Sequence, residues 1–263
     1  MPDSRGGVRK SPAIAIHTLQ FDDEWRRGLP VLSGSVVELR EVGFEDVPSL
    51  HVLIASDPKV TAYISPPPPT IRALQGFVAW AHQQREAGKL VCYAIVPKGL
   101  HYAVGIIQVR KIQPNFFVGE WGFVLGAAFW GTGVFEDAAI LVANFAFDTV
   151  GVHRLEARAV TSNARGNGAL QKIGAQGEAI LRAGLKRDNV LLTQYLWSLR
   201  SVDWQARRSA VRTRFDPGRV ENQIQQALIE TRRAIAREVP LPPGRHEIPL
   251  HPFFISDERE SDD

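Results

Sequence analysis

Apolar side chains recur along the chain with two different spacings, and these predict strands separated by helices. Residues 36–41 (Val-Val-Glu-Leu-Arg-Glu) alternate apolar and polar side chains, as strands do. Elsewhere apolar residues lie three or four positions apart, which is typical of helices. The predicted strands cover residues 36–41, 90–96, 102–110, 118–125, 154–160, 177–185 and 191–199, and the predicted helices cover residues 45–55, 70–86, 138–150 and 163–173.

Turn and cap residues fix several of these ends. Residues 97–99 (Pro-Lys-Gly) and 187–189 (Arg-Asp-Asn) separate neighbouring strands and predict two hairpins. Thr70 follows a run of four prolines and predicts a helix N-cap, and Gly174 predicts a helix end. The resulting order, β-α-α-β-β-β-α-β-α-β-β, predicts one layered domain of the α/β (α+β) class.

The N-terminal part differs in composition from this central region. Residues 1–32 mix glycine, proline and charged side chains, which predicts a weakly structured arm. Trp25 and the pair Leu29-Pro30 are the candidates for anchoring this arm to the domain. We therefore expect an arm over residues 1–32 and a domain over residues 33–204.

Residues 205–263 form a C-terminal extension rich in arginine. Apolar residues on one face predict an amphipathic helix at residues 219–237, and the tail at 256–263 is acidic and expected to be solvated and mobile. The segment 205–238 has three interpretations, which are packing on the domain, contact between two copies of the chain, or contact with an acidic partner such as RNA.

Composition narrows the classes of function. The chain has 263 residues, 44% of them hydrophobic, and a net charge of +3, which supports a packed core and makes nucleic-acid binding an unlikely primary role. Cys92 is the single cysteine and the histidines lack metal-ligand spacing, so we expect neither a disulfide within the chain nor a metal site. The most apolar stretch, residues 138–147, is about half a membrane span. We expect a cytoplasmic protein without membrane contact.

The strongest candidate for ligand binding is a glycine-containing loop before a predicted helix. Residues 129–138 read Phe-Trp-Gly-Thr-Gly-Val-Phe-Glu-Asp-Ala. Glycines allow a tight turn, and a helix start offers unpaired N–H donors, so the loop suits an anion such as a pyrophosphate. A tight connection without a ligand is the alternative. A P-loop is disfavoured because no Gly-Lys-Ser/Thr follows, and a dinucleotide fingerprint because Glu136 stands at its third glycine.

Further motifs lie in order around this loop. They are Val37-Glu38-Leu39-Arg40 followed by Glu45-Asp46, Gly119-Glu120-Trp121-Gly122-Phe123-Val124-Leu125, Phe129-Trp130-Gly131-Thr132-Gly133, Gly151-Val152-His153-Arg154-Leu155-Glu156-Ala157, Asn163, and Leu170-Gln171-Lys172-Ile173-Gly174. This series resembles the GNAT superfamily of acetyl-CoA-dependent N-acetyltransferases, in particular the ribosomal-protein N-terminal alanine and serine acetyltransferases. The resemblance covers roughly residues 36–204.

The resemblance implies a fold and a cofactor site. The fold would be a mixed, mostly antiparallel sheet with flanking helices, in which the central parallel strands 118–125 and 154–160 splay apart. Acetyl-CoA, as co-substrate, would lie in the gap between these strands. The backbone of Phe123, Val124 and Leu125 would pair with its pantetheine arm, Asn163 would help to hold that arm, and the pyrophosphate would take the N–H groups of Trp130, Gly131, Thr132, Gly133, Val134 and Phe135.

The resemblance also implies the reaction. A primary amine, either a protein N-terminus or a small-molecule amine, would attack the thioester directly. Glu120 would accept a proton from the ammonium, directly or through water. An ion pair with a neighbouring arginine or histidine, or the capping of a chain end, is the structural alternative for Glu120. We expect the enzyme to be a monomer or a homodimer.

Three residues depart from the family pattern. Phe135 replaces a small residue at the phosphate loop, Gly166 replaces a frequent serine, and Leu170 replaces a frequent tyrosine. No general acid is therefore assigned. These departures keep open a catalytically weak acyl-CoA-binding regulatory module, and the arginine-rich extension keeps open a ribosome- or RNA-associated protein.

Overall fold

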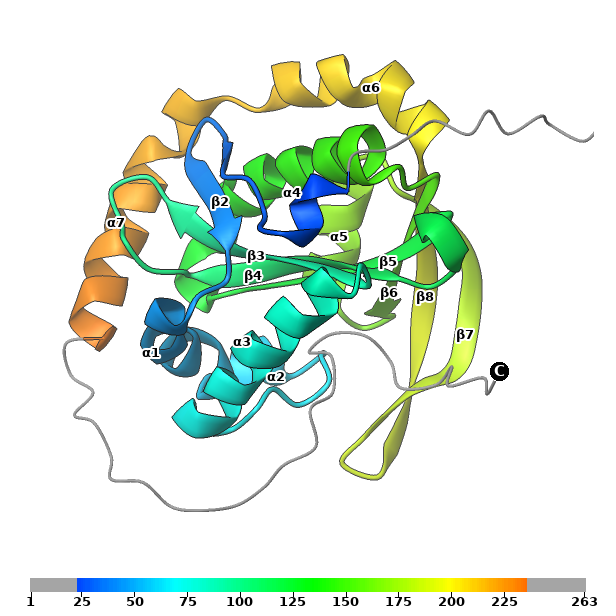
Figure 1. The fold of residues 1–263 in the computed structure, drawn as a ribbon. Coiled ribbons are helices and arrows are strands. Elements are labelled where there is room, and N and C mark those ends of the chain that lie inside the picture. The colour runs from blue at the N-terminus through cyan, green and yellow to red at the C-terminus, as the bar shows by residue number, and fades with distance from the viewer. Residues whose placement is uncertain (1–22, 236–263) are drawn as a thin grey trace, which may run out of the picture.

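The structure, a computed structural model, describes residues 23–235, and its centre is an eight-stranded sheet with helices on both faces (Figure 1). The strand order is β1-β2-β3-β4-β5-β6-β8-β7, and β5 and β6 form the parallel pair among otherwise antiparallel neighbours. The strands are β1 (Leu32–Ser33), β2 (Val37–Glu41), β3 (Leu90–Pro97), β4 (Gly105–Lys111), β5 (Val118–Leu125), β6 (Arg154–Val160), β7 (Gln176–Arg187) and β8 (Val190–Arg200).

Helices α1 to α3 cover one face of the sheet and α4 and α5 cover the other, while α6 and α7 run around the outside (Figure 1). This arrangement confirms the predicted mixed, mostly antiparallel sheet with flanking helices. The helices are α1 (Val47–Leu50), α2 (Pro58–Thr61), α3 (Ile71–Glu86), α4 (Val134–Asn144), α5 (Ala164–Lys172), α6 (Ser201–Arg214) and α7 (Pro217–Ile235), with π-helical turns at His51–Ala55 and Phe145–Val150 and 3₁₀ turns at Glu24–Arg26, Phe44–Asp46, Pro114–Phe116 and Ala127–Phe129.

The core lies on both faces of the central strands. All eight residues of β3 are buried, as expected for a strand covered by helices on both sides. Tyr93 of β3 packs edge-on against Phe145, with ring centroids 5.6 Å apart, and this contact joins the sheet to the end of α4. The sheet therefore forms a rigid base for the loops at its edges.

Most predicted elements are confirmed, and three differ. The predicted helix 138–150 begins earlier, at Val134 directly after Gly133, and its second half, Phe145–Val150, is a π-helical turn. The predicted helix 45–55 is divided into a 3₁₀ turn, the short α1 and a π-helical turn, since Pro48 lies in its first turn. The predicted strand 102–110 begins only at Gly105, because the N–H of Ala103 donates to the carboxylate of Asp46 and leaves the sheet. Thr70 caps α3 as predicted, with its Oγ1 accepting from the N–H of Ala73 at 3.2 Å.

Asp46 is a buried anchor between β2 and the helical face. Its carboxylate accepts two hydrogen bonds from the guanidinium of Arg40, both at 2.7 Å. It also accepts from the N–H groups of Gly43 and Ala103, each at 2.9 Å. The side chain of Asp46 is fully buried, and these four hydrogen bonds compensate the carboxylate for the water it loses on burial.

Asp137 makes a similar connection on the opposite face. Its Oδ2 accepts from the N–H groups of Val36 at 2.7 Å and Val37 at 3.1 Å. Asp137 lies in the first turn of α4, directly after the glycine loop. The hydrogen bonds therefore fix the start of α4 against β2.

The C-terminal extension packs on the body of the protein. Trp204 of α6 is fully buried and donates to Oδ1 of Asn144 at 2.8 Å, which joins α6 to α4. Ile224, Ala227 and Leu228 of α7 are buried. Of the three interpretations of the extension, the described part shows packing on the domain.

Near the other end, Trp25 is buried and packs edge-on against Phe116, at 5.9 Å between ring centroids. The remaining predictions for residues 1–22 and for the acidic tail at 256–263 lie outside the described residues. Within residues 23–235, no helix combines the length and the apolar character needed to cross a bilayer.

We predict that Asp46→Asn lowers the free energy of unfolding by about 2–4 kcal/mol, because it leaves a largely buried Arg40 with a neutral partner. Urea unfolding followed by circular dichroism measures this. The matched control is Glu45→Gln, since Glu45 also pairs with Arg40, at 3.0 Å, but its side chain is 63% exposed. That variant should change stability by less than about 0.5 kcal/mol. Equal effects of the two substitutions would contradict the assignment of Asp46 as the anchor.

Candidate functional site at the splayed strands

The parallel strands β5 and β6 pair over three residues and then diverge. The pairs are Val118 with Arg154, Gly119 with Leu155, and Glu120 with Glu156. Beyond these pairs β5 stays bonded to β4 up to Leu125, whereas β6 stays bonded to β8. A gap therefore opens between the second halves of β5 and β6.

The register shows which backbone groups of β5 face this gap. The N–H of Gly126 donates to the carbonyl of Val104, and the N–H of Ile112 donates to the carbonyl of Val118. Because bonded and non-bonded pairs alternate in an antiparallel ladder, the even-numbered residues of β5 bond to β4. Phe123 and Leu125 therefore direct their backbone groups to the gap, and Val124 directs its groups to β4.

The glycine loop lies at the far end of β5, between Leu125 and α4. Gly131 and Gly133 both have φ of +78°, the left-handed region that glycine adopts without strain. The N–H of Trp130 bonds to the carbonyl of Ala127, and that of Thr132 to the carbonyl of Phe129. Among the described residues, no partner is found for the N–H groups of Gly131, Gly133, Val134 and Phe135. Four of the six predicted phosphate donors are thus available.

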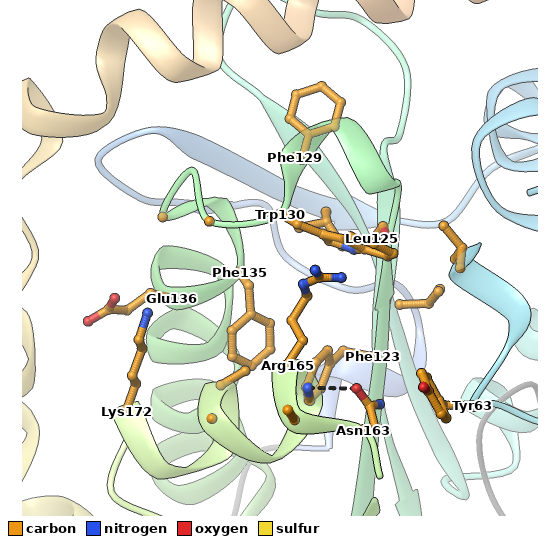
Figure 2. Close-up of a pocket in the computed structure, with 18 of the residues that line it drawn as sticks. Tyr63, Phe123, Leu125, Phe129, Trp130, Phe135, Glu136, Asn163, Arg165 and Lys172 are labelled. Carbon is orange, nitrogen blue, oxygen red and sulfur yellow. Dashed lines mark hydrogen bonds between the residues drawn. The ribbon is translucent and has the colours of Figure 1, made fainter. Parts of the chain in front are cut away.

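A cavity of about 760 Å³ joins this loop to the gap. Figure 2 shows it, with the end of β5, the loop and α4 along its walls and the start of α5 below. Asn163, Arg165 and Lys172 line it from the α5 side, and Lys59 and Tyr63 line it from α2 and the residues after it. A cavity of this volume is of the size that proteins use for cofactors and drug-sized ligands.

Cationic side chains outnumber acidic ones in this lining. Lys59, Arg165 and Lys172 are the cations, and Glu136 and Asp216 are the acids. The guanidinium of Arg165 lies 3.8 Å from the centroid of the Trp130 ring, and the indole N–H of Trp130 donates to the carbonyl of Leu125 at 2.8 Å. The sequence reasoning did not identify Arg165. Its place two residues after Asn163, in the first turn of α5, was the available signal.

Phe135 points into the cavity and stacks on Phe123, with ring centroids 4.0 Å apart (Figure 2). The backbone N–H of Phe135 stays available, as described above. The stacked rings lie beside the backbone of Phe123, which faces the gap. The two rings therefore form part of the cavity wall at the end of β5.

Asn163 caps α5 and lies at the bottom of the cavity. Its Oδ1 accepts from the N–H of Gly166 at 2.9 Å, as Figure 2 shows. Asn167, one turn later, donates from Nδ2 to the carbonyl of Val160 and accepts from the indole N–H of Trp197, at 3.0 and 2.9 Å. These bonds fix the start of α5 against β6 and β8, and the role of Asn167 was not predicted from the sequence.

Glu120 lies at the last residue pair before the strands diverge. Its carboxylate accepts a hydrogen bond from Arg110 at 2.9 Å and lies 3.7 Å from Nε of Arg158. Burial raises the pKa of Glu120 above that of an ordinary glutamic acid, although Arg110 and Arg158 both act to lower it and Glu156 adds to the rise. The carboxylate is buried and lines neither this cavity nor the smaller one described next, which Arg158 does line.

A second cavity of about 70 Å³ opens between β5 and β6 next to the first. Arg158 and Gln194 line it, together with Trp121. The indole N–H of Trp121 and Oε1 of Gln194 are buried without a partner in the described part of the chain. These groups can bind a small polar ligand that enters this cavity.

Comparison with known proteins adds to this geometry. A sequence model of the acetyltransferase (GNAT) domain matches residues 37–176, slightly more than half of the chain. The chain belongs to the GNAT acetyltransferase family. It is therefore an acyltransferase, of a family that uses acetyl-CoA as co-substrate.

The individual relatives agree with this membership. An N-acetyltransferase of Bacillus licheniformis named p20, itself described as uncharacterized, is 25% identical over 162 residues, which are 61% of this chain and 90% of the relative. The structure is also similar to Mycobacterium smegmatis RimJ in complex with CoA-disulfide, at 17% identity and a TM-score of 0.61, over 70% of this chain and 94% of that one. A provisionally named ribosomal-protein-serine acetyltransferase of Vibrio cholerae is 14% identical with a TM-score of 0.56, over 65% and 97% of the two chains.

The residues present fit the family's co-substrate. Four free N–H groups at a helix start suit the diphosphate. The backbone of Phe123 and the N–H of Leu125, which face the gap, suit an amide-containing arm, while the carbonyl of Leu125 already accepts from the indole of Trp130. Among residues 23–235, no group of three or more potential metal-ligating side chains is present.

We predict that Gly131→Asp weakens CoA binding at least tenfold, because it places a carboxylate beside the phosphate donors. The matched control is Gly131→Asn, which has the same shape and tolerates positive φ equally well. A Cβ at this position meets no atom within 4 Å, so neither variant clashes. Calorimetric titration with CoA should show binding by Gly131→Asn within about threefold of the unaltered protein. Equal affinities of both variants would contradict phosphate binding at this loop.

Proposed function

We propose that this protein transfers an acetyl group from acetyl-CoA to a primary amine. The observation that carries the proposal is the continuous cavity from the free N–H groups of the glycine loop to the gap between β5 and β6. A diphosphate on the loop and an arm along β5 would direct the far end of the cofactor toward the last strand pair, where Glu120 lies.

Each part of the cofactor has residues that would hold it. The N–H groups of Gly131, Gly133, Val134 and Phe135 would bind the diphosphate, and the backbone of Phe123 and Leu125 would pair with the pantetheine arm. Asn163 would contribute its side-chain amide, whose Nδ2 is not needed for the cap of α5. When bound, acetyl-CoA supplies an acetyl group activated as a thioester. The remaining contributions of the chain are positioning and proton transfer.

Glu120 is the proposed general base. A raised pKa matches a carboxylate that must accept a proton near neutral pH, and burial provides this rise. Glu120 does not line the second cavity, but Arg158 does and lies 3.7 Å from its carboxylate, so the proton would reach Glu120 through water beside Arg158. Arg110 and Arg158 both act to lower this pKa and so limit the rise that burial causes.

The proposed acceptor is a protein N-terminus. The names of the RimJ and ribosomal-protein-serine acetyltransferase structures favour this class over small amines. The second cavity supports it, because it offers the indole N–H of Trp121 and the amide oxygen of Gln194 to the atoms next to the amine. Those groups suit the first peptide unit of a chain, which carries both a carbonyl and an N–H.

The test is a pair of peptides that are identical except for an acetylated N-terminus, together with a panel of polyamines and amino acids. Thiol release from acetyl-CoA measures turnover, and mass spectrometry locates the acetyl group. The proposal expects modification of the free N-terminus and none of the blocked peptide. Turnover with polyamines alone would contradict the acceptor class.

A second candidate function is an acyl-CoA-binding module with little turnover. The contact of Phe135 with Phe123 favours it, because two aromatic rings occupy the wall where the family has a small residue at the position of Phe135. This candidate expects CoA to bind in calorimetry while no peptide or amine in the panel is acetylated.

For the catalytic role we predict that Glu120→Gln reduces turnover at least 100-fold, because the base is removed while the shape stays the same. Glu156→Gln is the matched control, since Glu156 is paired with Glu120 across the strands. It should retain turnover at neutral pH.

The same pair of variants predicts a pH effect with a definite sign. The base acts when deprotonated, so kcat/KM falls as the pH drops through the raised pKa of Glu120. Glu156 raises that pKa, so Glu156→Gln should move the acidic limb of the profile to lower pH. A shift to higher pH, or unchanged turnover in Glu120→Gln, would contradict Glu120 as the base.

A further inference from the structure

The connection between α6 and α7 forms part of the cofactor cavity. Phe215 and Asp216 lie in this connection, Val220 lies in the first turns of α7, and all three line the cavity. They lie well beyond residue 176, where the match to the family ends. The family fold alone therefore does not account for this wall.

Phe215 contacts the glycine loop directly. A Cβ added to Gly133 would lie 2.6 Å from Cε2 of Phe215 and 3.3 Å from Cγ1 of Val220. At Gly131, by contrast, an added Cβ would meet nothing within 4 Å. The ring therefore supports one specific glycine, whose N–H is among the free donors of the loop.

The connection that carries Phe215 is held in place on both the α6 side and the α7 side. On the α6 side, Arg208 pairs with Asp148 at 2.9 Å, and Trp204 is buried against the end of α4. On the α7 side, Asp216 accepts from the N–H of Gly218 at 3.1 Å and Ile224 is buried. The connection therefore belongs to the packed structure, and the ring of Phe215 has a defined position.

We propose that Phe215 and Val220 are cofactor-positioning residues, which hold the glycine loop in its donor-presenting conformation and close the outer wall around the nucleotide end of CoA. This inference rests on the proposed function of the cavity. Gly133 can leave its φ of +78° easily when nothing packs on it, since glycine populates many conformations. The apolar contact removes this freedom before the ligand binds, which strengthens binding by preorganisation.

Phe215 and Val220 should strengthen binding only at the nucleotide end of the cofactor. Phe215 and Val220 contact Gly133, where the diphosphate would bind, whereas Phe123, Leu125 and Asn163 would hold the pantetheine arm and the thioester. Loss of the ring should therefore weaken binding of the whole cofactor. Turnover of a donor that carries the thioester and the pantetheine arm but no nucleotide should stay unchanged.

Asp216, unlike Phe215 and Val220, should weaken cofactor binding, because its carboxylate repels the diphosphate. It is an exposed carboxylate in the lining, beside a loop that would bind a dianionic diphosphate. Asp216→Asn keeps the cap of α7, because asparagine caps helices as well as aspartate does. This variant should bind CoA about threefold more tightly, since a repulsion screened by solvent is removed.

The experiment compares Phe215→Ala with the unaltered protein. Calorimetry with CoA should show about tenfold weaker binding, and the KM for acetyl-CoA should rise by a similar factor while kcat and the KM for the peptide stay the same. With S-acetylpantetheine as donor, kcat/KM should not change. Phe215→Leu, which restores most of the apolar contact, should recover at least half of the lost binding free energy.

Ile229→Ala is the matched control, since Ile229 lies on the same helix α7 with 43% of its surface exposed. It should bind CoA like the unaltered protein. Thermal unfolding of Phe215→Ala shows whether the fold is kept. Where Phe215→Ala does not fold, Val220→Ala replaces it in the same assays with the same expected direction.

The outcomes separate the inference from the proposed function. No CoA binding by the unaltered protein would overturn both. Binding by the unaltered protein with equal affinity in Phe215→Ala would overturn the inference alone. Tighter binding in Phe215→Ala would also overturn it, since the ring would then cover the loop instead of supporting it. An equal loss of kcat/KM with S-acetylpantetheine would also overturn the inference, because the substitution would then have disturbed the whole fold and not the nucleotide end alone.

Discussion

The divergence of β5 from β6 after Glu120 and Glu156 is the constraint on which the site depends. Each strand continues with its other neighbour, β5 with β4 and β6 with β8. The backbone groups of Phe123 and Leu125 consequently face a gap instead of a strand. Unpaired backbone groups inside a protein are costly, so such a gap requires water or a ligand with amide groups. The binding potential of the site follows from topology before any side chain contributes.

The elements next to the gap are fixed from several directions. Asp137 fixes the first turn of α4 to β2, and Asn167 fixes the first turn of α5 to β6 and β8. The glycine loop and Asn163 lie directly before these two helices. Four N–H donors and one amide are therefore presented by elements that are hydrogen-bonded to the sheet, which suits a reaction in which positioning supplies most of the rate enhancement.

The sequence predicted the fold well where the signal is local. The spacing of apolar residues predicts β3, β5, β6 and α3 nearly to the residue. Thr70 begins α3 and Gly174 follows the end of α5, both as predicted. The sequence did not predict the late start of β4, because that depends on a hydrogen bond from Ala103 to Asp46, distant in the sequence. It also did not predict α6 as a separate helix.

The same distinction applies to the site. The glycine loop could be found from its own residues, because the spacing of Gly131 and Gly133 before a helix is a local signal. For Glu120 the sequence offered an ion pair with an arginine as an alternative, and Arg110 forms one. Which arginines surround Glu120 could not be predicted, because Arg110 and Arg158 come from two other strands and meet it only through the register. The contact of Phe215 with Gly133 depends on the path of the whole extension. Side chains that meet through tertiary packing leave no pattern in the sequence.

The most direct test of the account is a crystal structure of the protein with CoA. We expect the diphosphate on the N–H groups of Gly131, Gly133, Val134 and Phe135, and the pantetheine arm bonded to the backbone of Phe123 and Leu125 in the gap between β5 and β6. CoA bound outside this gap, or bound there without contact between its diphosphate and the glycine loop, would contradict the account.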